Sequence, residues 1–283
     1  MSVTLGGRVF DGSRPLVMGI LNVTPDSFFD GGNYESATAA VERAMAMIGE
    51  GADIIDIGGE SSRPGAEPVS YDDEIRRLMP VIETVAARTC VPISVDTYKA
   101  RIAREALEAG ACIVNDISAL GFDADMTGVI RDSGASVILM HMLGEPRTMQ
   151  KDPRYNDPVN DILGFLHLRI EAAIAGGIPR DRIIVDPGIG FGKTLDHNIA
   201  LIRDIGRFHE TGCPVCVGVS RKSMFGMLTG AQPVDRIWGT AAVTALCVAA
   251  GVEIHRVHDV REMRQVCDTA AAFRTVSPST IRG

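Results

Sequence analysis

Carboxylates stand at the ends of two strongly apolar runs of this sequence. Asp96 ends the run PISVD, and Asp186 ends the run IIVD. A carboxylate at such a position is partly removed from water and needs hydrogen-bond donors or a positive charge. Asn115 and Lys222 also follow apolar runs, so they are candidates to share one site with the aspartates. The pattern favours a ligand that presents an N–H edge, although a structural salt bridge or a helix N-cap also explains each aspartate.

The segment GVSRKS (218–223) carries a second set of polar residues. Its backbone N–H groups favour an anion, and Ser220 is expected to cap the helix that follows. Lys222 then falls in the first turn of that helix, where a cation is electrostatically unfavourable. We therefore expect Asp186 to be the partner of Lys222, and the alternative is a solvated lysine.

Arg256 and His258 are separated by one residue in the run IHRVHD. In a strand, this spacing points both side chains to the same face. A guanidinium beside an imidazole suits a phosphate or a diphosphate, because arginine donates paired hydrogen bonds to such groups. A salt bridge of Arg256 with Asp259 or Glu253 is the alternative that the sequence leaves open.

Glycines dominate the segment DPGIGFGKT (186–194), where they let the backbone approach a flat ligand closely. Phe191 would add an aromatic face to this turn. The spacing matches neither the dinucleotide-binding fingerprint nor the P-loop, so a nucleotide site is not predicted. Cys213 and Cys216 have CxxC spacing, but the chain lacks a second ligand pair at zinc-site spacing. We therefore predict that these cysteines pack as small apolar side chains.

Eight short apolar runs must position these side chains. They span residues 17–21, 54–55, 92–95, 112–114, 137–140, 183–185, 215–217 and 254–257. Apolar residues recur at helical spacing over residues 35–50, 72–88, 99–109, 123–133, 158–175, 195–208, 234–250 and 260–273. This alternation predicts a parallel sheet, and eight units favour an α/β fold of the closed (β/α)8 TIM barrel type. No Pro/Ser-rich linker divides the chain, so we predict a single domain over residues 1–283, with the strand ends on one rim.

The composition excludes several classes of protein. A hydrophobic content of 46% supports a large core and excludes disorder of the whole chain. A net charge of -8 argues against nonspecific nucleic-acid binding. The chain has neither the ~20 apolar residues of a membrane span nor the pattern of a signal peptide. We expect a cytoplasmic protein that binds no nucleic acid and no membrane.

Three connections that follow predicted strands are long, at residues 22–34, 58–70 and 144–156. Loops of this length in a compact domain are usually functional. Because all three follow strand ends, they are expected to lie over the same rim of the barrel.

Taken in order, the motifs resemble those of the bacterial dihydropteroate synthases, a pterin-binding family. The matching stretches are MGILNVTPDSFFDGG, DIIDIGGESSRPGA, ISVDTYKA, IVNDIS, LMHMLGEPRTMQ, DPGIGFGKT, GVSRKSMFG and HRVHDV, and they run from Met18 to Val260. The resemblance implies a (β/α)8 barrel and a transferase of folate synthesis. Its substrates would be 6-hydroxymethyl-7,8-dihydropterin diphosphate and 4-aminobenzoate, with Mg²⁺ as cofactor. Electron release from the dihydropterin would favour an SN1-like departure of diphosphate.

The resemblance also implies roles for individual residues. Asn22 would bind the magnesium ion and the diphosphate, Ser62 would contact phosphate, and Ser220 would face 4-aminobenzoate. The predicted catalytic residues are Arg63, Lys222, Arg256 and His258. The predicted substrate-binding residues are Asn22, Ser62, Asp96, Asn115, Met140, Asp186, Phe191, Ser220, Lys222, Arg256 and His258.

Two positions depart from the family pattern. Ser62 stands where threonine is usual and keeps a hydroxyl, and Phe29 replaces a commoner serine. Two other functions stay open: a corrinoid-dependent methyltransferase, which is not expected to carry both TPDSF and SRKS, and a noncatalytic paralogue that binds pterin. A homodimer is the family expectation, and the Ala-rich residues 240–250 could form its contact or face inward.

Overall fold

The structure is a computed structural model that describes residues 1–23, 33–61 and 69–275. At its centre, parallel strands pair in the order β8-β7-β6-β5-β4-β3-β10-β9. A parallel bridge between Val185 and Val215 brings the two ends of this order together. The predicted (β/α)8 barrel is confirmed, with strands β3 (Leu16–Asn22), β4 (Ile54–Gly58), β5 (Ile93–Asp96), β6 (Ile113–Asp116), β7 (Ser136–Met140), β8 (Ile183–Asp186), β9 (Cys216–Val217) and β10 (Ile254–Val257).

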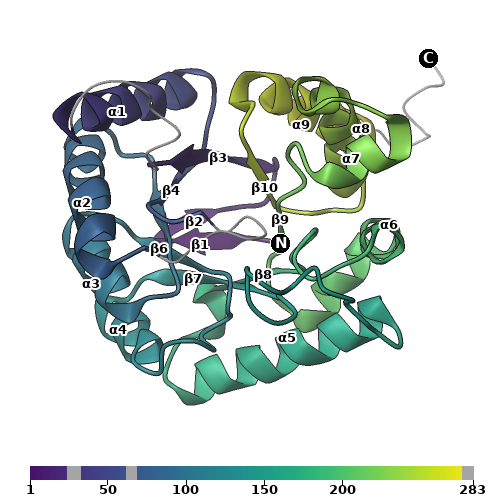
Figure 1. Ribbon diagram of the computed structural model, residues 1–283, viewed down its shortest axis with the longest axis horizontal. Coiled ribbons are helices and arrows are strands. Elements are labelled where there is room, and N and C mark those ends of the chain that lie inside the picture. Colours follow the sequence, from purple (N-terminus) through teal and green to yellow (C-terminus); the bar gives the residue numbers. More distant parts are fainter. Residues whose placement is uncertain (24–32, 62–68, 276–283) are drawn as a thin grey trace.

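Helices surround the barrel, as Figure 1 shows. They are α1 (Asn33–Gly49), α2 (Tyr71–Arg88), α3 (Ala100–Glu108), α4 (Met126–Ser133), α5 (Pro158–Ala175), α6 (Leu195–Arg203), α7 (Ser223–Thr229), α8 (Ile237–Ala249) and α9 (Val260–Thr275), with 3-10 helices η2 (Arg180–Arg182), η3 (Ile205–Thr211) and η4 (Pro233–Arg236). The stripe predicted at 195–208 is divided between α6 and η3 at Asp204, whose φ of -104° and ψ of 21° leave the α-helical region. Among the described residues, no helix is both long and apolar enough to cross a membrane.

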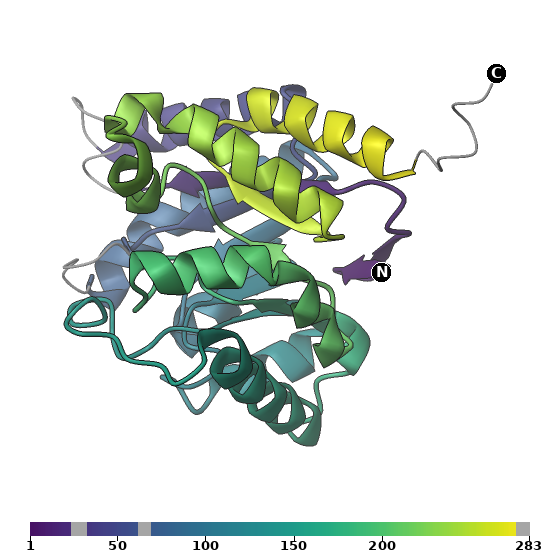
Figure 2. The same ribbon diagram turned by 90° about the vertical axis from the view of Figure 1, so that its right-hand side faces the viewer.

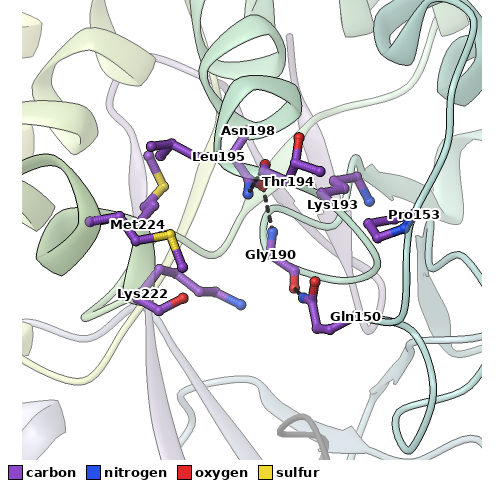
Figure 3. Close-up of a pocket in the computed structure, with 11 residues that line it drawn as sticks. Gln150, Pro153, Gly190, Lys193, Thr194, Leu195, Asn198, Lys222 and Met224 are labelled. Carbon is purple, nitrogen blue, oxygen red and sulfur yellow. Dashed lines mark hydrogen bonds between the residues drawn. The ribbon is translucent and has the colours of Figure 1, made fainter.

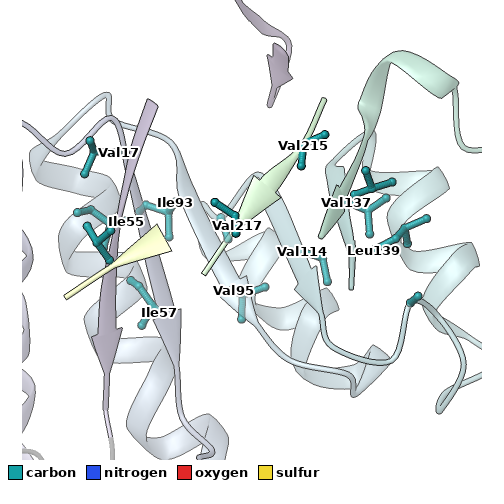
Figure 4. Packing of buried hydrophobic residues seen from close by; sticks show 14 of the residues in the cluster. Val17, Ile55, Ile57, Ile93, Val95, Val114, Val137, Leu139, Val215 and Val217 are labelled. Carbon is teal, nitrogen blue, oxygen red and sulfur yellow. The ribbon is translucent and has the colours of Figure 1, made fainter. Parts of the chain in front are cut away.

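Side chains alternate between two environments along each strand. Val17, Ile55 and Val95 belong to the large core cluster that includes the surrounding helices, and Figure 4 shows them with their neighbours. The alternate residues point into the barrel and form a second cluster near the amino ends of the strands, with Met18, Ile54, Ile113, Ile138, Ile184, Cys216 and Ile254. Because side chains fill the barrel at this level, a ligand is expected at the carboxyl ends of the strands.

A hairpin that the sequence analysis did not predict closes the amino end of the barrel. Its strands β1 (Val3–Leu5) and β2 (Arg8–Phe10) pair antiparallel, and Figure 2 shows it at one end of the barrel strands. Val3 and Leu5 are each 1% exposed and belong to the inward-facing cluster. The hairpin therefore covers apolar side chains that water would otherwise contact.

An ion pair near this end is expected to make folding stability depend on pH. His209 Nε2 lies 3.1 Å from Glu253 Oε2. The hydrogen bond to Glu253 raises the pKa of His209 above its ordinary value. Burial raises the pKa of Glu253, but hydrogen bonds from His209 and the Val215 N–H lower it overall. The contribution of His209 to stability is thus present below about pH 6.5 and is lost as the pH rises through its raised pKa. The contribution of Glu253 is lost as the pH falls through its lowered pKa.

We expect His209→Gln to lower the free energy of unfolding by about 1 kcal/mol at pH 5.5 and by much less at pH 8.5. Urea unfolding of both proteins at the two pH values measures this difference. The exposed His167 on α5 provides the control, since His167→Gln should have little effect at either pH. Equal losses for His209→Gln at both pH values would contradict the prediction.

Candidate active site

Polar side chains occupy the inward-facing positions directly above the apolar layer of the barrel. In five strands, a polar residue stands two places after an inward-facing residue, so the period of two points it to the barrel axis. These residues are Asp56, Asp96, Asn115, Asp186 and Arg256, on β4, β5, β6, β8 and β10. The structure therefore gathers the predicted Asp96, Asn115, Asp186 and Arg256 at the carboxyl ends of the strands, which we call the rim.

Arg256 links two carboxylates across the rim. Its Nε donates to Asp56 Oδ2 at 2.6 Å, and its Nη2 donates to Asp96 Oδ2 at 2.7 Å. Asn115 Nδ2 also donates to Asp56 Oδ2, at 3.2 Å. The alternative pairing of Arg256 with Asp259 or Glu253 is wrong, because the inward direction of its side chain brings it to β4 and β5.

The charges of this cluster shift the pKa values of its members. Burial and the charge of Asp56 raise the pKa of Asp96 to about 7, against the lowering effect of Arg256. Burial lowers the pKa of Arg256, but Asp56 and Asp96 together raise it above its ordinary value. The guanidinium therefore stays charged, beside a carboxyl group that can change its protonation near neutral pH.

Asp186 is 5% exposed at the end of β8. Its Oδ1 accepts a hydrogen bond from the Gly188 N–H at 2.7 Å, and the buried Cys216 thiol also interacts with this carboxylate. Burial raises the pKa of Asp186, while the Gly188 hydrogen bond and the charge of Lys222 lower it. Gly188 has a left-handed φ of 68°, and a Cβ there would lie 1.9 Å from the carbonyl oxygen of His141. Only glycine fits this turn.

The expectation that Asp186 pairs directly with Lys222 is wrong. Among the described residues, Lys222 forms no ion pair within 4.0 Å, and its Nζ lies 4.3 Å from the centre of the Phe191 ring. Burial and the charge of Arg256 lower the pKa of Lys222 to about 8, against the raising effects of Asp186 and Asp96. Lys222 thus interacts electrostatically with both aspartates at longer range. Its close contact is the cation–π interaction with Phe191.

Ser220 does not cap the helix that follows it. Its Oγ accepts from the His258 N–H at 3.1 Å and lies 2.9 Å from His258 Nδ1. Arg221 separates Ser220 from α7 with a left-handed φ of 55°, and Lys222 occupies the N-cap position without a side-chain cap. The hydroxyl of Ser220 instead fixes the end of β10, where His258 stands.

Apolar side chains form one wall of the rim. Ile117, Met140, Met142 and Met149 are buried together, and the rings of Tyr98 and Phe191 pack against them. Met140 stands two places after the inward-facing Ile138 on β7, so it also points into the barrel, and it is 5% exposed. A flat heterocycle that places its polar edge on Asp186 could lay its face on this wall.

A cavity of about 350 Å³ lies beside Lys222. Figure 3 shows that it lies between the Gly190 turn, Met224 at the start of α7, and the loop with Gln150 and Pro153. That loop belongs to the predicted long connection 144–156, and Gln150 Nε2 donates to the carbonyl oxygen of Gly190. This connection therefore lies at the rim, as predicted.

Asn22 is the last residue of β3 and pairs in register with Gly58, which pairs with Asp96. It therefore lies at the rim. Ser62, Arg63 and Phe29 lie outside the described residues.

No group of three or more His, Cys, Asp or Glu side chains in the described ranges could hold a metal ion. Magnesium is commonly bound through few protein ligands and substrate phosphate oxygens, so an amide such as that of Asn22 fits an ion that is bound mainly by diphosphate.

The candidate residues predicted from the sequence omit Asp56. The apolar run predicted there stops at residue 55, but β4 continues to Gly58, so Asp56 lies inside the strand with no exposed surface. Its Oδ1 is buried and accepts no hydrogen bond in the described structure. An aspartate between Ile55 and Ile57 was the signal that could have identified it. Cys213 and Cys216 are buried free thiols, as predicted.

Comparisons with known proteins agree with this site. The pterin binding enzyme family matches residues 18–258. The dihydropteroate synthase of Escherichia coli strain K12 is 44% identical over 276 residues, which cover 98% of this chain and 95% of that protein. Two structures of the Xanthomonas albilineans dihydropteroate synthase each cover 98% of this chain. The complex with 4-aminobenzoic acid has a TM-score of 0.91, 42% sequence identity and 99% coverage of its own chain. The complex with 7,8-dihydropteroate has a TM-score of 0.87, 39% sequence identity and 100% coverage of its own chain. The chain belongs to the dihydropteroate synthase family of pterin-binding enzymes, and it is a transferase.

Proposed function

We propose that this chain condenses 6-hydroxymethyl-7,8-dihydropterin diphosphate with 4-aminobenzoate to give 7,8-dihydropteroate and diphosphate. The observation that carries the proposal is the buried Asp186 at the carboxyl end of β8, whose Oδ1 is fixed by the Gly188 N–H. The pyrimidinone edge of a pterin presents adjacent N–H donors, which such a carboxylate accepts. A site built to pair these donors rejects analogues that lack them. The structures of the Xanthomonas albilineans enzyme with 4-aminobenzoic acid and with 7,8-dihydropteroate support the same amine substrate and the same product.

The remaining rim residues would divide the other contacts. Asp96, Asn115 and Lys222 would line the pterin pocket with Met140 and Phe191. Arg256 would lie over the heterocycle and reach phosphate with His258, whose position depends on Ser220. Ser62 and Arg63 would contact phosphate, and Ser220 would face 4-aminobenzoate.

The reaction would proceed by departure of the leaving group before attack. The bond between the exocyclic methylene carbon and the diphosphate oxygen breaks, and electron release from the dihydropterin ring stabilises the cation. The amine of 4-aminobenzoate then forms the C–N bond and releases a proton. Positive charge from Arg63, Arg256 and His258 would stabilise the departing diphosphate. The loops over the rim would exclude water, which would otherwise trap the cation.

Magnesium would assist through the diphosphate. When bound, the ion neutralises charge on the leaving group. Asn22 is the protein ligand that the rim offers, and diphosphate oxygens and water would complete the coordination. Titration of Mg²⁺ into chelator-treated protein with both substrates should restore turnover.

A two-substrate assay tests the proposal. Purified protein with Mg²⁺ and both substrates should release diphosphate and form dihydropteroate, and omission of either substrate should abolish both signals. Binding of pterin without turnover would instead support a noncatalytic paralogue. Methyl transfer from methyltetrahydrofolate to a corrinoid would support a methyltransferase.

A homodimer is also proposed, through the surface formed by α7, η4 and α8. Val234 and Trp238 are 76% and 78% exposed there, and Met227 and Leu228 are also exposed. Large apolar side chains that gather on a surface mark contacts between proteins. The opposite side of α8 packs inward through Thr240, Thr244, Cys247 and Val248, which leaves Trp238 for a second copy.

We expect Trp238→Glu to convert a dimer to a monomer, because it places a charge in an apolar contact. Light scattering at matched concentrations measures the mass of each protein. Leu168→Glu is the control, since Leu168 is 73% exposed on α5, away from this surface. A monomeric wild-type protein, or a Trp238→Glu protein that stays dimeric, would reject this surface.

A further inference from the structure

Lys193 is a buried lysine to which the proposed reaction assigns no role. It follows the glycine-rich turn after β8 and is 3% exposed. Among the described residues, no carboxylate lies within ion-pair distance of its amino group. Burial lowers the pKa of Lys193 well below its ordinary value, because a cation without a direct counter-charge is costly to bury, so the amino group is expected to make specific contacts.

Three acceptors surround the Nζ atom of Lys193. The Nδ1 atom of His141 lies at 3.0 Å, the carbonyl oxygen of Phe191 at 2.9 Å, and the carbonyl oxygen of His141 at 3.4 Å. The amino group of Lys193 donates hydrogen bonds, so it fits a set of groups that can accept them. Lys193 therefore connects the end of β7, where His141 stands, to the turn that follows β8.

His141 is held so that it can accept from Lys193. Its ring is 4.8 Å from the ring of Phe165 at an interplanar angle of 89°, and 5.9 Å from the ring of Tyr155. Burial, together with Lys193, lowers the pKa of His141 to about 3, so the imidazole is neutral at pH 7. A neutral ring that accepts at Nδ1 must carry its proton on Nε2.

The same turn carries two contacts of the candidate active site. The Gly188 N–H donates to Asp186, and the Phe191 ring lies against Lys222. Figure 3 shows the amino groups of Lys193 and Lys222 on different sides of the Gly190 turn. Lys193 thus contacts the Phe191 backbone of this turn, while the Phe191 ring contacts Lys222.

We propose that Lys193 is a positioning residue for pterin binding: its amino group fixes the turn after β8 against His141, and so places Phe191 and the Gly188–Asp186 contact for the heterocycle. This inference rests on the proposed function. Loss of the three hydrogen bonds would leave the turn free to move, while the side chains that touch the ligand would remain.

The test uses Lys193→Met, which keeps length and removes the donors. Calorimetry with 6-hydroxymethylpterin should show an affinity about tenfold lower than that of the wild type, because the contacts are no longer pre-organised. The melting temperature should be unchanged or higher, because the variant no longer buries an amino group whose charged form has no direct counter-charge. Lys151→Met, at an exposed lysine of the 144–156 connection, should leave affinity and melting temperature at wild-type values.

Two further measurements separate positioning from a general structural role. Nitrogen NMR should show that His141 carries its proton on Nε2 in the wild type and loses this preference in Lys193→Met. In a double-mutant cycle, Lys193→Met with His141→Phe should bind no more weakly than the worse single variant, since both remove one linkage. His141→Phe also tests the idea if Lys193→Met does not fold, because it should lower affinity in the same way.

Unchanged pterin affinity in Lys193→Met would overturn the inference, as would a loss of affinity accompanied by an equal loss in Lys151→Met. A large drop in melting temperature together with weaker binding would assign Lys193 to folding instead. If the wild-type protein binds no pterin, the proposed function itself fails, and this result is distinct from any result on the variants.

Discussion

Arg256→Lys is expected to lower kcat/KM about 100-fold, because two different nitrogens of Arg256 serve two carboxylates. Nε donates to Asp56, and Nη2 donates to Asp96. The single ammonium of lysine cannot occupy both positions, so one buried carboxylate loses its donor. The charge near the departing diphosphate also becomes less well placed. Steady-state assays with each substrate varied in turn measure the effect.

Arg221→Lys is the matched control for this prediction. Arg221 also uses Nε and Nη2, but both donate to the single carboxylate of Asp259, and the side chain is 46% exposed. Exposed ion pairs contribute little, so its kinetics should stay near those of the wild type. Wild-type kinetics for Arg256→Lys, or equal losses in both variants, would contradict the role of Arg256.

Asp186→Asn is expected to weaken binding of 6-hydroxymethylpterin by about 100-fold or more. The Gly188 N–H donates to Oδ1, so it would orient the amide of an asparagine at this position. The amide oxygen of asparagine would accept from Gly188, and the NH₂ group would then point to the N–H donors of the pterin. Two donors that face each other cannot pair, so the substitution replaces attraction with an unsatisfied contact. Calorimetry measures the loss.

Stability and pH provide the controls for Asp186→Asn. Because burial raises the pKa of Asp186, a neutral amide should cost the fold little, and the melting temperature should not fall. Wild-type affinity should weaken as pH falls through this raised pKa, and the variant should lack this dependence. Asp125→Asn, at an exposed aspartate before α4, should bind as the wild type does. Unchanged affinity in Asp186→Asn would remove the observation on which the proposed function depends.

The strand ends could be predicted because the signals are local. An apolar run that stops at a polar residue describes Asp96 on β5 and Asp186 on β8 in the structure as it does in the sequence. Right-handed connections then place all these ends on one rim. Asp56 shows the limit of this signal, since the strand continues past the polar residue and only its pairing with Ile20 of β3 fixes its position.

Contacts between residues from different loops could not be predicted in this way. Lys222 was expected to pair with Asp186 because opposite charges attract, but its Nζ lies over the Phe191 ring. Ser220 was expected to cap a helix, but the left-handed backbone at Arg221 turns it toward His258. Both outcomes depend on backbone conformation in turns, which residue type only weakly determines.

The sequence by itself determined the (β/α)8 barrel, the family and the set of polar residues at the rim, because hydrophobic periodicity and motif order are properties of the chain alone. The tertiary structure decided which of these residues meet. It joined Arg256 to Asp56 and Asp96, and Lys193 to His141, across strands and turns far apart in sequence. Such partners are selected by packing and by the need of every buried polar group for a hydrogen bond, and neither is set until the barrel closes.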